Sequence, residues 1–293
     1  MNGEGKKTNL TMIIMILGFA LIFLLIIFAL FSSPPTGSSS LKGGLDARFN
    51  GNTNLKSGGY FDLNFSIINS YDVLLENIKV WVEAGKIFTI NANPISRSLT
   101  LKTYPHLPTK SNITYFFSGI KVEKLDAEIR NVPIILKIQF VPIFVKNFTI
   151  NVANNNTLHL YGGFENVGIK EKREKSLSPL SVYFSHNSKD FVFEEGKRNF
   201  AAFKIIIENT GGGRCVEDAK IKVESSRNLI CYYKNESLVA PFETSHKIDK
   251  KFEIPCNFTL SYLREKDFDS VSSSIQVSCE YLEEKTFRFN IIP

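Results

Sequence analysis

The chain has 293 residues, of which 43% are hydrophobic and 22% are charged, and its formal net charge is +6. This composition excludes an intrinsically disordered chain, because it supplies enough apolar surface to build a core. The uncharged stretch Leu10–Phe31 also argues against a freely soluble protein.

The segment Leu10–Phe31 predicts a transmembrane helix. At about 1.5 Å per residue it would span roughly 33 Å, slightly more than the hydrocarbon core of a bilayer. Lys6 and Lys7 precede the segment, and the next charge is Lys42. This charge distribution predicts a single-pass protein of the cell membrane, with a cytoplasmic N-terminus and an extracellular C-terminal bulk. A cleaved signal peptide is the alternative, but Phe31 is a poor residue at a cleavage site.

The remaining chain divides into regions of different composition. We expect a cytoplasmic tail (1–9), the transmembrane helix (10–31), a flexible stalk rich in Ser, Pro and Gly (32–44), a first β-sandwich (45–152), a linker (153–179) and a second, cysteine-containing β-sandwich (180–293). The linker contains the mixed charge run 170–175, which we interpret as a solvated loop.

Beyond the stalk the apolar residues recur with period two, which is the pattern of half-buried antiparallel strands. Helical patterns are scarce, and only 122–130 is a candidate for a short helix or a crossover. The alternating segments include Phe61–Ile67, Ile78–Val82, Ile113–Phe117, Leu136–Phe140 and Phe148–Val152. The predicted fold class is therefore all-β.

The strand pattern returns about 140 residues later, which predicts a duplicated domain. The opening strand 61–69 matches 201–209. The closing hairpin repeats at an offset of 139: 136–140 matches 275–279, and 148–152 matches 287–291. Turn spacing and length favour two tandem immunoglobulin-like β-sandwiches after the single N-terminal transmembrane helix. A closed barrel is the alternative.

The turn Asn209-Thr210-Gly211-Gly212-Gly213, followed by the strand Ala219–Val223, resembles the tandem β-sandwich modules of archaeal surface-layer-type membrane-anchored proteins. Those modules are similar to the CARDB family of cell-adhesion-related domains. The resemblance covers 180–293 and, more loosely, 45–152. It implies extracellular binding or scaffolding and transfers no catalytic residue.

Four cysteines, Cys215, Cys231, Cys256 and Cys279, all lie in the second copy. Their spacing lacks the short ligand pairs of a zinc site, and an extracellular setting favours two disulfides over free buried thiols. In an immunoglobulin topology the strand opened by Cys215 neighbours the strand of Cys279. This favours the pairs Cys215–Cys279 and Cys231–Cys256.

The outer part of the chain contains six Asn-x-Ser/Thr sequons, which are candidates for N-glycosylation. The acceptor residues are Asn64, Asn112, Asn147, Asn155, Asn235 and Asn257. We expect Asn64, Asn147 and Asn257 to lie in strands, with their side chains opposite the apolar face.

No sequence motif predicts catalysis, a cofactor or a metal site, so we expect no enzymatic activity. The predicted function is adhesion, envelope scaffolding or partner binding, through an unknown surface protein or cell-envelope polymer. An accessory subunit of a membrane-embedded secretion, pilus or glycosylation complex is the alternative. The basic residues form no clustered stripe, so we expect no nucleic-acid binding.

Overall fold

The computed structural model describes residues 44–293 except for 172–176, 197–198, 228, 262 and 264–266. The predicted tail and transmembrane helix, and all but the last residue of the predicted stalk, lie outside the described residues. Within the described part of the chain, no helix is long and apolar enough to cross a membrane. Residues from Gly43 to the C-terminus form one compact unit.

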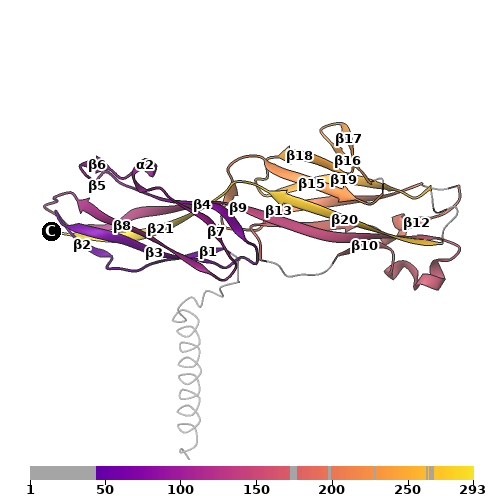
Figure 1. The fold of residues 1–293 in the computed structure, drawn as a ribbon, viewed down its shortest axis with the longest axis horizontal. Helices are drawn as coiled ribbons and strands as arrows, with labels where there is room; N and C mark the ends of the chain where they lie inside the picture. Colours follow the sequence, from indigo (N-terminus) through magenta and orange to yellow (C-terminus); the bar gives the residue numbers. More distant parts are fainter. Residues whose placement is uncertain (1–43, 172–176, 197–198, 228, 262, 264–266) are drawn as a thin grey trace, which may run out of the picture. The chain divides into compact units, whose positions relative to one another are not determined.

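The described residues form three sheets, so the predicted all-β class is confirmed (Figure 1). The N-lobe sheet contains, in spatial order, β1 (Leu45–Phe49), β3 (Tyr60–Asn69), β8 (Asn112–Val122), β5 (Phe88–Ile90) and β6 (Asn93–Pro94). The C-lobe sheet contains β11 (Leu180–His186), β13 (Phe200–Asn209), β19 (Lys251–Thr259), β16 (Leu229–Tyr233) and β17 (Glu236–Val239).

The third, shared sheet has 11 strands. Its main path is β14 (Arg214–Cys215), β21 (Tyr281–Ile292), β9 (Ile129–Asn154), β20 (Phe268–Ser278), β15 (Ala219–Ser225) and β18 (Phe242–His246). The strands that branch from this path are β2 (Asn54–Lys56), β4 (Leu75–Ala84), β7 (Lys102–Leu107), β10 (Gly168–Glu171) and β12 (Val192–Phe193). Each smaller sheet packs against one half of the shared sheet. The N-lobe is the first smaller sheet together with its half of the shared sheet, and the C-lobe is the second smaller sheet together with the other half.

The helices that lie wholly within the described residues are short, and they include elements that the sequence pattern did not indicate. They are α2 (Arg97–Thr100) and the 3-10 helices η1 (Leu158–Tyr161), η2 (Gly163–Glu165) and η3 (Ser188–Phe191). The expected linker, 153–179, contains η1, η2 and β10, and β10 pairs with β9. This segment is therefore largely part of the C-lobe, and Lys170 and Glu171 of the charge run belong to a strand.

The two smaller sheets repeat the same topology, which supports the predicted duplication. Leu45 pairs with Asn69 in the N-lobe, and Leu180 pairs with Asn209 in the C-lobe. Asn69 Nδ2 donates to the carbonyl of Val73, four residues on, at 2.9 Å. Asn209 Nδ2 donates to the carbonyl of Gly213, also four residues on, at 2.9 Å. The two asparagines therefore close equivalent corners.

The closing strands are exchanged between the lobes. β9 runs without a turn through both lobes, and at about 3.3 Å per residue its 26 residues would extend about 85 Å. β20 pairs with its C-terminal half from Phe268↔Ala153 to Ser278↔Ile143. β21 pairs with its N-terminal half from Tyr281 onward. In Figure 1, β21 accordingly lies in the same lobe as β3 and β8, whereas β20 lies beside β15.

The register of the exchanged strands is the same in both lobes. Phe289 of β21 pairs with Val132, and Ile150 of β9 pairs with Val271. The residues of these two pairs correspond between the copies, because Phe289 and Ile150 are 139 positions apart, as are Val271 and Val132. Each lobe therefore receives the closing strand of the other copy at the equivalent position. The predicted hairpins at 136–152 and 275–291 therefore do not form. The expected division into tandem domains also differs from the observed lobes. Residues 281–292 complete the N-lobe, and residues 143–154 complete the C-lobe.

The exchanged strands supply core side chains to the lobe that receives them. The Phe287 ring of β21 lies 4.7 Å from that of Phe65 in β3. The Phe148 ring of β9 lies 4.4 Å from that of Phe184 in β11. Phe289 and Ile150 are fully buried. Each lobe's core thus depends on a strand from the other half of the chain.

Cysteine pairs placed on the exchanged strands test this pairing. Lys137 lies opposite Glu284, and their side chains form an ion pair of 3.6 Å. We expect a Lys137→Cys/Glu284→Cys variant to be joined within one chain by a short bifunctional thiol reagent, as measured by peptide mass spectrometry.

The matched control is Lys137→Cys/Val145→Cys, because Val145 would face Lys137 only if β9 folded back into its own hairpin. Along the straight strand these positions are about 26 Å apart. Efficient cross-linking of the control pair, with none of the first pair, would show that each lobe closes on itself.

Candidate functional site

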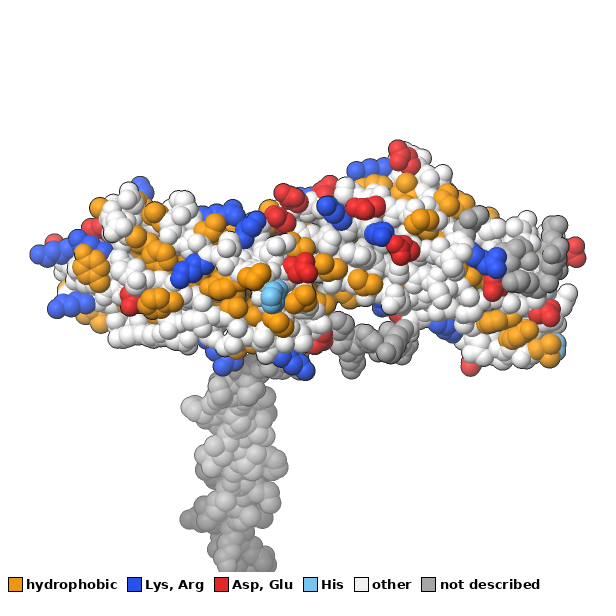
Figure 2. Space-filling model, in the orientation of Figure 1, with side chains coloured by type: hydrophobic (Ala, Val, Ile, Leu, Met, Phe, Trp, Pro, Cys, Tyr) orange, Lys and Arg blue, Asp and Glu red, His pale blue; other side chains and the backbone are white. Residues whose placement is uncertain are grey.

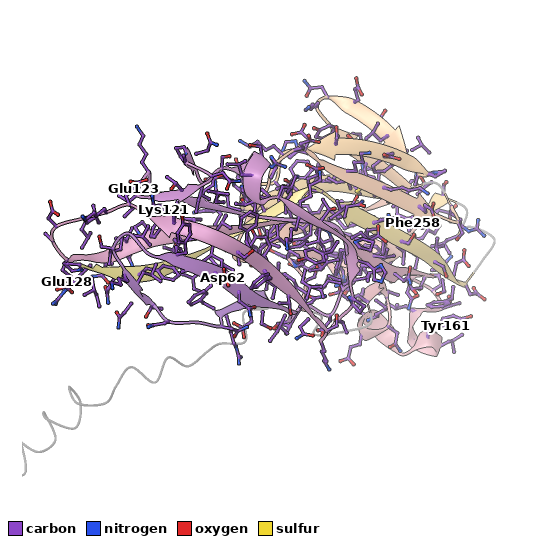
Figure 3. The ribbon with its side chains drawn as sticks, turned by 60° about the vertical axis from the view of Figure 1, so that its left-hand side comes forward. Asp62, Lys121, Glu123, Glu128, Tyr161 and Phe258 are labelled. Carbon is purple, nitrogen blue, oxygen red and sulfur yellow. A yellow bond between two sulfur atoms is a disulfide. The ribbon has the colours of Figure 1, made fainter. Side chains whose placement is uncertain are left out.

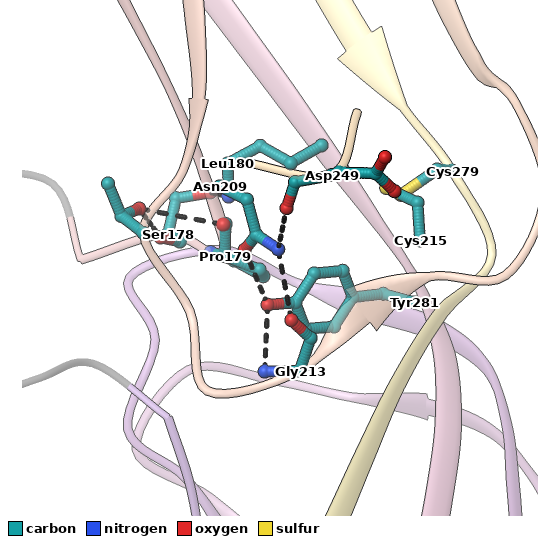
Figure 4. Close-up of a disulfide and its surroundings, with 10 residues drawn as sticks. Ser178, Pro179, Leu180, Asn209, Gly213, Cys215, Asp249, Cys279 and Tyr281 are labelled. Atoms are coloured by element: carbon teal, nitrogen blue, oxygen red, sulfur yellow. Dashed lines mark hydrogen bonds between the residues drawn. A yellow bond between two sulfur atoms is a disulfide. The ribbon is translucent and has the colours of Figure 1, made fainter. Parts of the chain in front are cut away.

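The lobe junction, where the chain passes from β20 into β21, concentrates the polar and covalent contacts shown in Figure 4. Cys279 lies between these two strands and is bonded to Cys215 of β14, with a Cα–Cα distance of 5.8 Å. β14 in turn pairs with the start of β21, Cys215 opposite Tyr281. The disulfide therefore fixes the point at which the chain changes lobe.

Tyr281 ties the first residues of β21 to the corner of the C-lobe sheet. Its hydroxyl donates to Asn209 Oδ1 at 2.8 Å and accepts from the backbone N–H of Gly213 at 3.0 Å. Burial raises the pKa of this phenol well above its usual value. Tyr281 therefore remains a protonated donor across the physiological pH range.

A second buried tyrosine joins β21 to the N-lobe. The Tyr71 hydroxyl donates to the carboxyl group of Glu283, which is only 1% exposed. Glu283 also accepts from the Leu45 N–H at 3.4 Å and lies 3.2 Å from the Lys285 amine. Burial, and then electrostatic repulsion from Glu283, raise the pKa of Tyr71 far above its usual value. These contacts give the buried carboxyl group of Glu283 hydrogen-bond and ion-pair partners, without which its burial would be costly in free energy.

Close packing at this junction explains two of the three glycines at 211–213. A Cβ on Gly213 would lie 2.1 Å from the carbonyl oxygen of Leu282, and one on Gly211 would lie 2.3 Å from the Tyr281 hydroxyl. A Cβ on Gly212 would meet nothing within 4 Å. Two of the glycines therefore allow the backbone to approach β21.

The second disulfide joins Cys231 and Cys256, which lie opposite each other on β16 and β19. The predicted pairing of all four cysteines is thus found in the structure. The spatial reason differs for Cys215–Cys279, because β14 pairs with β21 rather than with β20, the strand that ends just before Cys279. In the chain-entropy model, loops of 64 and 25 residues contribute about 4 and about 3.5 kcal/mol.

The six sequon asparagines lie in different environments. Asn112, Asn147, Asn155 and Asn235 are exposed. Asn64 is half-buried, and its Oδ1 is buried without a hydrogen-bond partner among the described residues. Asn257 is also half-buried and donates to the Tyr232 hydroxyl at 3.1 Å. As expected, Asn64, Asn147 and Asn257 lie within strands, and Asn147 is the exposed member of the three.

An open polar groove of about 660 Å³ lies over β9, β20 and β15, with Lys170 of β10 at its side. It is lined by Asn147, Phe148, Thr149, Lys170, Glu224, Ser225, Ser226, Ser272, Ser273 and Ser274. Asn147 was predictable from the sequence as a sequon, but the groove was not, because its lining residues on β9 and β20 lie more than 100 positions apart in the chain. Among the described residues, no group of three or more His, Cys, Asp or Glu side chains is placed to hold a metal ion.

Comparison with known proteins gives no family assignment. No family model and no curated protein matches the chain. One solved structure to which the chain is similar is Escherichia coli alpha-2-macroglobulin activated by porcine elastase, at 11% sequence identity and a TM-score of 0.16. The match covers 87% of this chain and 23% of that one. So low a similarity carries no argument, and function is inferred from this chain's own residues.

The glycine contacts predict a large difference between two neighbouring substitutions. Gly213→Ala should lower the free energy of unfolding by about 1–3 kcal/mol, because its Cβ would overlap the backbone of β21 and force a shift. Gly212→Ala should change it far less, since the space around Gly212 is open. Denaturant unfolding of the disulfide-intact protein measures both. Equal stabilities would mean that the 211–213 turn does not pack against β21.

Proposed function

We propose that this chain is a membrane-anchored extracellular protein that acts in adhesion, envelope scaffolding or partner binding. In this proposal Leu10–Phe31 is the membrane helix, and the two lobes are immunoglobulin-like β-sandwiches held outside the cell. The resemblance of the Asn209–Gly213 turn and the following strand to surface-layer-type modules points in the same direction. No catalytic role is assigned.

The oxidised state of all four cysteines is the observation that carries the proposed location. No free cysteine remains, and Cys231, Cys256 and Cys279 are each at most 5% exposed. Disulfide bonds persist in oxidising compartments and are rare in the cytosol. Together with Lys6 and Lys7 before the uncharged segment, they favour an extracellular position for the lobes.

The continuous ladder between β9 and β20–β21 supports a scaffolding role. Two lobes joined by a flexible linker would reorient freely, whereas lobes that share a hydrogen-bonded ladder resist bending at the junction. The Cys215–Cys279 bond and the Tyr281 contacts strengthen this connection. A protein that presents two binding surfaces at a fixed separation suits an adhesion or spacer function.

The surface charge favours a protein or polymer partner over a nucleic acid. On the face seen in Figure 2, Lys and Arg side chains are interspersed with Asp and Glu side chains rather than gathered into one stripe. A net charge of +6 still gives a weak attraction to an acidic envelope polymer.

An apolar surface at η1 and η2 is the best candidate for a partner contact. Leu160 is 67% exposed and Phe164 is 44% exposed. Tyr161, which Figure 3 labels, stacks on Phe268 of β20 with the ring centroids 4.8 Å apart. Neighbouring exposed apolar side chains of this kind often mark contact surfaces.

Cysteine labelling in intact cells tests the proposed topology. Lys121, an exposed residue of β8 labelled in Figure 3, becomes a reactive thiol in Lys121→Cys. We expect a membrane-impermeant maleimide to label this variant in intact cells, because the native cysteines are bonded. Thr8→Cys in the predicted tail should be labelled only after lysis. The reverse pattern would overturn the orientation.

Purification from native membranes tests partner binding. We expect Leu160→Ser/Phe164→Ser to reduce recovery of the co-purifying protein or polymer, as measured by mass spectrometry and sugar analysis. Tyr60→Ser is the matched control, because Tyr60 is 74% exposed but lies on β3 of the N-lobe. A stoichiometric membrane complex that is unaffected by either variant would favour an accessory subunit instead.

A further inference from the structure

The polar groove over the C-lobe contains a complete glycosylation sequon. Asn147 and Thr149 lie two positions apart on β9, so their side chains emerge on the same face of the sheet. Phe148 between them points inward and is 3% exposed. The acceptor amide and the hydroxyl of the sequon therefore both line the groove.

The strands beside the sequon supply hydroxyl groups at matching positions. Ser274 lies opposite Asn147, and Ser272 lies opposite Thr149. Glu224 of β15 lies opposite Ser274 on the far side of β20. Among the described residues, the side chains of Asn147, Thr149 and Ser272 have no hydrogen-bond partner. Glu224 is ion-paired with Lys222 at 2.7 Å, and its carboxylate can accept further hydrogen bonds. The groove therefore presents the unpaired side chains of Asn147, Thr149 and Ser272, together with this additional acceptor, to a ligand.

This lining suits a carbohydrate. Sugar hydroxyls both donate and accept hydrogen bonds, and Ser, Thr, Asn, Glu and Lys side chains complement them. The groove volume of about 660 Å³ lies within the range of small-ligand sites and can accommodate a few sugar units. Asn147 is the sequon asparagine among these lining residues, so its sugar would lie against this surface.

We propose that Asn147 carries an N-linked glycan whose first sugars lie in this groove and bind Ser272, Ser274 and Glu224. The proposal rests on the proposed extracellular location. In the transfer, Asn147 Nδ2 bonds to the anomeric carbon of an oligosaccharyl phosphate donor. Nδ2 releases one proton, and the phosphate departs with the electron pair of the broken C–O bond. Since Asn147 lies within a paired strand, transfer precedes folding of β9.

Glycopeptide mapping of the full-length protein from native membranes tests the attachment. We expect a glycan on Asn147 in the unaltered protein and in Thr149→Ser, which keeps the sequon. We expect none in Thr149→Val, which has nearly the same shape but no hydroxyl. A glycan on Asn112, Asn155 or Asn235 with none on Asn147 would overturn this inference while leaving the extracellular location intact.

Absence of sugar from all six sequons would also overturn the inference. The proposed location would then be decided by the labelling of Lys121→Cys: labelling in intact cells would retain it, and labelling only after lysis would overturn both proposals.

Periodate oxidation tests whether the sugar occupies the groove. Two or three hydrogen bonds should slow oxidation of the Asn147 glycan about tenfold in the folded protein compared with the unfolded chain. Ser272→Ala/Ser274→Ala should remove most of this protection without removing the glycan. A glycan oxidised equally fast in the folded and unfolded protein would show that it projects into solvent, which would overturn the binding role of the groove.

Discussion

The antiparallel ladder that β9 forms with β20 and β21 holds the two lobes together. Without it, each lobe would lack a core strand and would expose buried side chains such as Phe289 or Ile150. Fully burying a large apolar side chain contributes about 1.5–3 kcal/mol, so several such residues outweigh most other single contacts in a domain. Folding of either lobe is therefore coupled to the presence of the other half of the chain.

The disulfide and the polar contacts at the junction stabilise the same ladder. The Cys215–Cys279 bond, the Tyr281 hydrogen bonds and the close approach at Gly213 all act on the first residues of β21. Glu283 and Tyr71 then continue the polar contacts into the N-lobe. A strand that leaves one lobe and enters another has no turn to fix its direction, and these contacts provide that restraint.

The proposed contacts with a glycan or a partner lie on the outer surfaces of the lobes. The junction residues are largely buried and occupied with one another, which suits a structural role. The groove around Asn147 and the apolar surface at η1 and η2 belong to the C-lobe and face outward, where a glycan or a partner has access. The two surfaces combine segments from distant parts of the chain, which is why a rigid scaffold is needed to form them.

Strand positions and the duplication were predictable from the sequence, because alternation and repeat spacing can be read directly along the chain. The cysteine pairing was also predicted, but for Cys215–Cys279 it was predicted from a strand neighbour that differs from the observed one. The groove was not predictable, since Asn147 and Ser274 meet only through the pairing of β9 with β20. The linker prediction was wrong because β10 is short and its last two residues belong to the charge run.

The assignment of the closing strands to lobes was decided by tertiary structure alone. Residues 148–152 and 287–291 carry the same apolar alternation and fit the same register in either lobe. The local sequence pattern therefore supports two arrangements equally: a closing hairpin within each lobe, and an exchange of the closing strands between the lobes. The sequence by itself determined an all-β chain of two similar halves. The straight run of β9 through 140–143, together with the packing of Tyr281 and Gly213 at the junction, decided that each half completes the other.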